Sequence, residues 1–258
     1  MRYMATAVTD AGLVKKINQD SLTVKIAQTS AGQVCMAVVL GGLGGLSLGE
    51  VASGNVILAF DKWFKEQFMA PGAEWTGESI RNSWEDIIYS MNQKIKEYGA
   101  SQGVEMGTTI TAVLFLKDKY YAIHVGDSRL YELSDGCRQI TEDQTLIARE
   151  LAQGIITKEQ ALTDSRRNVL LQCIGVTQKL LPAFYSGNIN GEAAYLVCSD
   201  GFRHVITPDE IYQLCRPLQN LTQKVMQVNL TSLVERVKQR GERDNISAVL
   251  IQVGRATC

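Results

Sequence analysis

Several apolar runs in this chain are short, nearly continuous, and bounded by glycine or polar residues. Those at 34–40, 193–198 and 246–251 consist mostly of aliphatic residues, alanine and cysteine, and each predicts a buried strand. Residues 21–26 alternate between polar and apolar, and strand patterns return at 111–116, 120–125 and 130–133. The connection at 117–119 has hairpin length, so we expect antiparallel pairing of its two strands.

Helical periodicity fills the segments between these runs. Apolar residues recur at helical spacing from 47 to about 69 and from 80 to 98, with Pro71-Gly72 separating the two helices. Two further helices are expected, one opening at Pro208-Asp209 and one over about 218–240. Residues 144–181 are expected to be helical but polar, which suits a mobile surface subdomain. We predict one domain over residues 1–258, with antiparallel sheets covered by helices.

Charge and cysteine content argue against several classes of function. The net charge is −1 and the pI is about 6.2, so the chain offers no basic field for nucleic acid and no polybasic anchor for a membrane. No apolar stretch approaches the roughly 20 residues that span a bilayer, and no charged leader precedes an apolar run at the start. The six cysteines are scattered without a Cys-x-x-Cys pair, which indicates reduced core residues. We therefore expect a cytoplasmic protein.

Acidic or glycine-rich islands follow or precede the predicted strands. They are Asn18-Gln19-Asp20, Gly41-Gly42-Leu43-Gly44-Gly45, Gly126-Asp127-Ser128-Arg129, Ser199-Asp200-Gly201 and Asp244-Asn245. Carboxylates gathered from distant strand ends are the oxygen ligands that hard divalent cations require. Each island alone has a local explanation: an Asp-Gly turn, a capping residue, or a tight hairpin with an ion pair inside the Gly126–Arg129 motif. Their order along the chain is harder to explain locally.

That ordered set resembles the PPM family of metal-dependent serine/threonine protein phosphatases, also called type 2C, and especially its bacterial single-domain members. The segment from Gly12 to Asp20 is similar to the family's Gly-x-Val-Arg-x-x-Asn-(Glu/Gln)-Asp, and the glycine island is similar to Asp-Gly-Met-Gly-Gly. Further matches are Gly49-Glu50-Val51-Ala52-Ser53, Gly107-Thr108-Thr109, Gly126-Asp127-Ser128-Arg129, Thr141-Glu142-Asp143-Gln144, Ser199-Asp200-Gly201 and Asp244-Asn245. The resemblance covers nearly the whole chain.

The resemblance implies an α+β fold, namely a four-layer α-β-β-α sandwich of two antiparallel sheets flanked by helices, with a flap subdomain at about 141–181. It also implies two Mg²⁺ or Mn²⁺ ions at one end of the sheets and a water that attacks the phosphorus. Asp200 and Asp244 would hold the first metal, and the Gly42 carbonyl would face the second. Asp20 would support its water shell, and Asp127 would help a third, weaker site.

The implied substrate is a phosphorylated serine or threonine in a protein or phosphopeptide, with a cognate Ser/Thr kinase as a possible partner. Lys15, at the position where the family places arginine, would contact the substrate phosphate. Lys15, Asp20 and Asp127 are therefore the predicted catalytic residues, and Asp20, Gly42, Asp127, Asp200 and Asp244 the predicted metal-site residues.

Three positions depart from the family pattern. Gly41 stands where the family has the aspartate that bridges the two metals, and two cations about 3.5–4 Å apart repel strongly without a carboxylate between them. Lys15 replaces a planar arginine fork with a point charge. Gln144 replaces a histidine. His124 and His204 have no visible base or ligand partner in the sequence, so structural roles are expected for both.

Two hypotheses follow from these departures. The first is a phosphoprotein phosphatase with a weakened metal centre, and the second is a pseudophosphatase that acts as a binding or regulatory module. Nucleotide binding by the glycine island is a third idea, but the spacing fails because Glu50, not lysine, follows Gly49.

Overall fold

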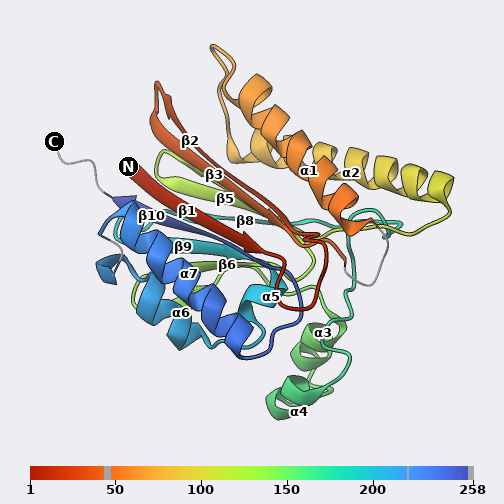
Figure 1. Ribbon diagram of the computed structural model, residues 1–258. Coiled ribbons are helices and arrows are strands. Elements are labelled where there is room, and N and C mark those ends of the chain that lie inside the picture. Colours follow the sequence, from red (N-terminus) through yellow and green to blue (C-terminus); the bar gives the residue numbers. More distant parts are fainter. Residues whose placement is uncertain (44–47, 220, 255–258) are drawn as a thin grey trace.

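The computed structural model describes residues 1–43, 48–219 and 221–254. Within these residues the strands form two five-stranded sheets in which all neighbours are antiparallel (Figure 1). One sheet has the order β1 (Arg2–Asp10), β10 (Ile246–Gly254), β9 (Ala194–Cys198), β6 (Arg129–Leu133) and β7 (Cys137–Gln139). The other has the order β2 (Ser21–Thr29), β3 (Gly32–Leu40), β4 (Ile110–Leu116), β5 (Lys119–Val125) and β8 (Ala183–Asn188).

Helices cover the outer face of each sheet. The β2–β8 sheet carries α1 (Gly49–Lys62), a π-helical turn η1 (Trp63–Phe68) and α2 (Gly77–Gln102). The β1–β7 sheet carries α5 (Asp200–Arg203), α6 (Pro208–Cys215) and α7 (Gln223–Gln239), with a short 3₁₀ turn η2 (Pro217–Gln219) between the last two. Two small helices, α3 (Leu146–Ala152) and α4 (Lys158–Thr163), lie apart from both sheets (Figure 1).

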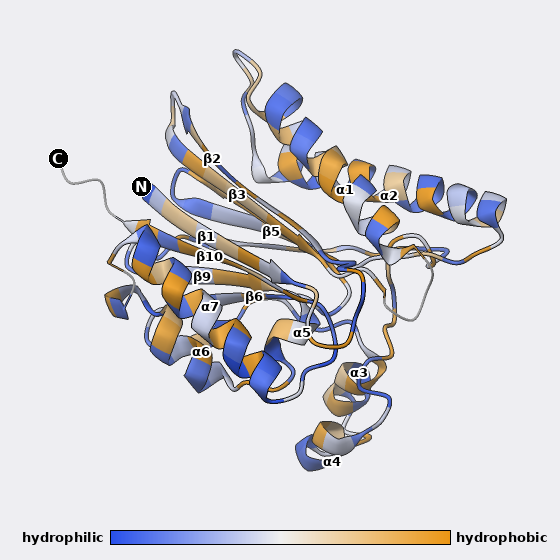
Figure 2. Ribbon diagram, viewed as in Figure 1, coloured by the Kyte–Doolittle hydropathy of each residue, from blue (hydrophilic) through white to orange (hydrophobic). Residues whose placement is uncertain are grey.

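Three apolar layers hold this arrangement together. Phe60 and Trp84 pack between the α1–α2 pair and its sheet, with ring centroids 5.7 Å apart. Phe115 and Tyr195 meet between the two sheets at 4.8 Å. Phe202 belongs to the third layer, under α7. Figure 2 shows the helices as alternating hydrophobic and hydrophilic bands, whereas β3 is hydrophobic along most of its length. The predicted four-layer sandwich is confirmed.

Most predicted elements are present, with differences at their ends. The apolar runs at 34–40, 193–198 and 246–251 lie in β3, β9 and β10, and the 117–119 connection joins β4 to β5 as a hairpin. The first predicted helix is observed as α1 followed by η1, and its expected start at residue 47 lies outside the described residues. The last helix begins at Gln223, where Thr222 accepts a hydrogen bond from the Val225 amide as its N-cap.

Other expectations were wrong. Residues 144–181 are mostly not helical, since only α3 and α4 form there and both are short. Strands β1, β7 and β8 were not predicted. Among the described helices, none has the length and hydropathy that a membrane span requires.

Candidate metal centre

The predicted islands meet at one end of the sandwich, where their backbones touch. The Gln19 amide donates to Asn245 Oδ1 at 2.9 Å, and Ser53 Oγ donates to the Gln19 carbonyl at 2.6 Å. Glycine is required at two of these contacts, because a Cβ at Gly42 would lie 2.3 Å from the Gln19 carbonyl oxygen, and one at Gly201 would lie 2.2 Å from that of Asn245. The segments that carry Asp20, Asp200 and Asp244 are therefore packed directly against one another.

The carboxylates of these segments interact electrostatically. Burial raises the pKa of Asp20 to about 7; hydrogen bonds from Ser247 and Ser199 oppose the rise, while the charges of Asp200 and Asp244 add to it. Burial also raises the pKa of Asp244, with Asp200 contributing in the same direction. The Oδ2 atom of Asp20 is buried and has no hydrogen-bond partner among the described residues. A bound cation would offset the repulsion among these three acids and would give the unpaired oxygen a partner.

Gly41 lies beside this unpaired acid. Its amide donates to Thr109 Oγ1 at 3.0 Å, and its carbonyl accepts from the Thr109 amide at 2.9 Å. A Cβ built on Gly41 would lie 3.2 Å from Thr109 Oγ1 and 3.7 Å from Asp20 Oδ1. The backbone there is outside the left-handed region, so an ordinary residue is conformationally allowed. The Cβ of any side chain at position 41 would thus lie next to the Asp20 carboxylate.

The acids do not form a complete cation cage by themselves. Within residues 1–43, 48–219 and 221–254, no three histidine, cysteine, aspartate or glutamate side chains are grouped closely enough to hold one ion. A cation here would draw on at most two such side chains, together with backbone carbonyls and water. Mg²⁺ and Mn²⁺ accept oxygen donors of this kind, so the residues fit a divalent cation that is held weakly.

Lys15 and Gln144, where the resemblance led us to expect two further departures from the family pattern, have definite partners. Lys15 Nζ lies 3.6 Å from Asp244 Oδ1, with the lysine side chain partly exposed. Gln144 Oε1 accepts from the Gly126 amide at 2.8 Å, and the Gln144 amide donates to the Gly126 carbonyl at 2.8 Å. Lys15 therefore reaches the predicted centre, and Gln144 fixes the turn that precedes Asp127.

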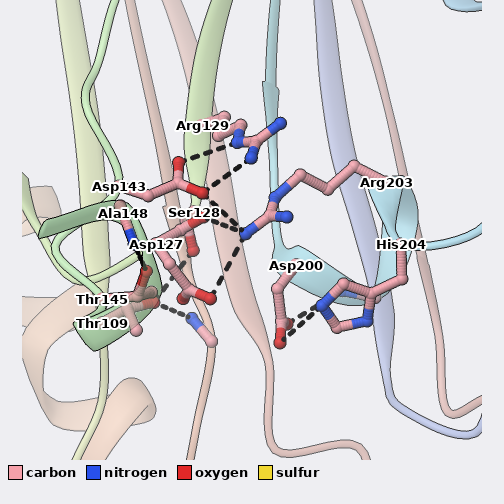
Figure 3. A network of polar contacts seen from close by, with 12 residues as sticks. Thr109, Asp127, Ser128, Arg129, Asp143, Thr145, Ala148, Asp200, Arg203 and His204 are labelled. Carbon is pink, nitrogen blue, oxygen red and sulfur yellow. Dashed lines mark hydrogen bonds and ion pairs between the residues drawn. The ribbon is translucent and has the colours of Figure 1, made fainter. Parts of the chain in front are cut away.

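Asp127 belongs to a network of two aspartates and two arginines (Figure 3). The alternative explanation of the Gly126–Arg129 motif, an ion pair inside it, is not what the structure shows, because Arg129 forms a two-bond fork with Asp143 at 2.7 and 2.6 Å. Asp127 instead faces Arg203, whose Nη2 is 3.3 Å from Asp127 Oδ2. Burial raises the pKa of Asp127 to about 7 and Asp200 adds to the rise, whereas Arg203 acts in the opposite direction. Sequence reasoning did not single out Arg203, and it named Asp143 only as part of the Thr141–Gln144 motif, without a role.

The two histidines differ in their surroundings. His204 lies between Asp200 and Glu242, with Nε2 3.5 Å from one and Nδ1 3.3 Å from the other, two partners that were not visible in the sequence. Burial favours the neutral ring, but the hydrogen bond to Glu242 and the charge of Asp200 outweigh it and raise the pKa of His204. His124 is fully buried, its Nδ1 lies 2.9 Å from Thr111 Oγ1, and burial lowers its pKa to about 4.

Comparison with known proteins agrees with this arrangement. The family model described as Protein phosphatase 2C matches residues 14–238. The chain belongs to this family. Among curated relatives, the serine/threonine phosphatase stp of Listeria innocua is 28% identical over 247 residues, which is 95% of this chain and 93% of the relative. Dependence on divalent metal is general for this family, and the curated relatives of this chain include bacterial serine/threonine phosphatases named stp and PstP.

Solved structures show the same fold. The S. agalactiae serine/threonine phosphatase is 26% identical, with a TM-score of 0.84, and the alignment covers 98% of this chain and 100% of that one. The catalytic domain of the phosphatase PstP, solved in complex with two manganese ions, is 26% identical with a TM-score of 0.78 and 98% and 99% coverage.

Proposed function

We propose that this chain is a metal-dependent phosphoserine/phosphothreonine protein phosphatase whose metal centre holds its cations weakly. The observation that carries the proposal is the contact between the Asp20, Asp200 and Asp244 segments, with Asp20 Oδ2 unpaired and Asp20 Oδ1 3.7 Å from a Cβ built on Gly41. Loss of the carboxylate that the family pattern has at position 41 is the reason to expect weak binding.

In this proposal Asp200, Asp244 and the Gly42 carbonyl hold Mg²⁺ or Mn²⁺, and the second of the family's two sites is the weaker one. A divalent cation bound there would lower the pKa of a water molecule and neutralise charge on the phosphoryl oxygens. Asp20 Oδ2 would accept a hydrogen bond from that water and hold it in place. Lys15 Nζ, now 3.6 Å from Asp244, would attract the substrate phosphate as a point charge.

The substrate is proposed to be a phosphorylated protein, which a cognate Ser/Thr kinase would supply. A cavity of about 760 Å³ supports a binding role for the flap, defined as residues 141–181. Its lining includes Ile147 and Leu162 from the flap, Pro208 from α6, and Arg203 and His204 from α5 and its end. An extended peptide entering this cavity would approach the candidate centre from the flap side.

A catalytically inactive phosphopeptide-binding module is the second candidate. It is favoured by the absence of any side chain at Gly41 and by the pairing of Lys15 with Asp244, which places the ammonium group on a proposed metal ligand. Such a module would bind a phosphopeptide through the cavity beside the flap and the Lys15 ammonium group, but it would not hydrolyse the phosphate.

Hydrolysis of p-nitrophenyl phosphate, measured across Mn²⁺ concentrations, separates the two candidates. The phosphatase proposal expects metal-dependent turnover that disappears in Asp200→Asn and persists in Asp118→Asn, a control in the exposed β4–β5 turn. No turnover at millimolar Mn²⁺ would remove the phosphatase proposal. Retained binding of a phosphoserine peptide in that case would favour the inactive module.

A further inference from the structure

Arg203 is a nearly buried arginine directed at an acid of the candidate site. It ends helix α5, three residues after Asp200, and its side chain is only 12% exposed. Its Nη2 donates to the Asp127 backbone carbonyl at 2.9 Å and lies 3.3 Å from Asp127 Oδ2. Its Nε is buried without a hydrogen-bond partner in the part of the chain that the structure describes. The guanidinium therefore contacts Asp127 through Nη2, while its buried Nε has no partner among the described residues.

The same guanidinium also faces a second acid. Arg203 Nη2 lies 3.4 Å from Asp143 Oδ2, and Asp143 is held from its other side by the two-bond fork of Arg129. Figure 3 shows the guanidinium of Arg203 between Asp127 and Asp143. Two arginines thus alternate with two aspartates, so the formal charges of this network cancel.

The residues around Asp127 do not fit a further divalent ion. A divalent ion ligated by the Asp127 carboxylate would lie close to the positively charged guanidinium of Arg203, and the two cations would repel each other. Each aspartate of the network is already paired with an arginine. A divalent ion would therefore have to displace an arginine from its partner, which costs free energy. The third, weaker metal site implied by the family resemblance is therefore at odds with the position of Arg203.

We propose that Arg203 is a built-in cation that takes the place of a divalent ion at Asp127 and closes this position to metal. The inference builds on the proposed metal-dependent function and concerns which ions the chain can bind. Metal bound to this chain would then depend on Asp200 and Asp244 and not on Asp127. The charge beside Asp127 would stay the same whatever the metal concentration.

Counting bound Mn²⁺ tests this directly, with free Mn²⁺ followed by electron paramagnetic resonance during titration of the full chain. We expect wild type and Asp127→Asn to bind the same number of ions. We expect Arg203→Gln to gain about one weakly held ion, because it frees a buried carboxylate. The double variant Arg203→Gln/Asp127→Asn should lose that ion again.

Arg138→Gln is the matched control, because it removes an arginine that pairs with Glu132 away from the site and should leave the count unchanged. Loss of one ion in Asp127→Asn would overturn the proposal, as would a folded Arg203→Gln that gains none. Thermal melting reports whether Arg203→Gln is folded. If it is not, the comparison of wild type with Asp127→Asn decides the question alone.

Failure of this inference can be told apart from failure of the proposed function. The proposed function requires ions that disappear in Asp200→Asn, whereas this inference concerns only ions that depend on Asp127. A chain without any Asp200-dependent ion, but with an Asp127-dependent ion in Arg203→Gln, would refute the proposed centre and support the role of Arg203.

Discussion

Replacing Gly41 with aspartate should weaken the metal-free protein and strengthen metal binding. The new Cβ would lie 3.2 Å from Thr109 Oγ1, so that hydroxyl must move by a few tenths of an ångström, while the backbone needs no change. The same Cβ would lie 3.7 Å from Asp20 Oδ1, which brings the two carboxylates together. At about 4 Å and an effective dielectric constant of about 20, two like charges repel by about 4 kcal/mol.

Protonation limits that cost. Because the pKa of Asp20 is already raised to about 7, one proton can be shared between the two acids near neutral pH, and we expect a net loss of about 1–3 kcal/mol without metal. A divalent ion at the same distance attracts the new carboxylate by about 8 kcal/mol on the same scale, before the ion loses water. After that cost we expect Mn²⁺ to bind about 10- to 100-fold more tightly, which corresponds to about 1.4–2.7 kcal/mol.

Isothermal titration with Mn²⁺ and thermal melting with and without Mn²⁺ measure both effects. Gly41→Asn is the control, because it has nearly the same shape without the charge. The reasoning predicts a lower melting temperature for metal-free Gly41→Asp and a larger rise on adding Mn²⁺ than in Gly41→Asn. Equal Mn²⁺ affinity in the two variants would refute it, since the added charge would then not face the ion.

Three further changes probe other parts of the structure. His124 has a folded pKa of about 4 against an ordinary 6.5, so the unfolded chain binds more protons between these values and stability falls as pH falls through that window. In urea unfolding, wild type should lose about 1.3 kcal/mol more than His124→Asn between pH 7.5 and 5.5, and equal losses would contradict this. Lys15→Arg should lower the inhibition constant for inorganic phosphate severalfold through a two-bond fork; an unchanged constant would place Lys15 away from the phosphate. Trp84→Ala should cost about 3–5 kcal/mol in urea unfolding, because the ring is fully buried against Phe60, and a loss below about 1 kcal/mol would mean that the layer repacks.

The interior strands could be predicted because their sequence alone reports their burial. Strands β3, β9 and β10 contain nearly continuous apolar runs, and the hairpin between β4 and β5 is set by the local Lys117-Asp118 turn. Strand β8 is different, since it is an edge strand of mixed exposure that contains Ser186, Gly187 and Asn188. Strand β1 pairs only with β10, at the far end of the chain, and no local pattern encodes such a partner.

The candidate site, too, contains residues that could be predicted from the sequence and residues that could not. The aspartates could be predicted because each stands in a short motif whose order is informative. Arg203 could not, since an arginine on a four-residue helix has the pattern of a surface charge, and its partners Asp127 and Asp143 are far away in the sequence. The same holds for His204 and Glu242, which are 38 positions apart and meet only in the folded chain.

Anomalous diffraction from crystals of the wild-type chain soaked in Mn²⁺ would test the central claim most directly. The account predicts a manganese peak within ligand distance of Asp200 and Asp244, with partial occupancy and water for most of its remaining ligands. It predicts no peak at Asp127, next to Arg203. Manganese absent from the Asp20, Asp200 and Asp244 segments at millimolar concentration, or bound only elsewhere, would contradict the account.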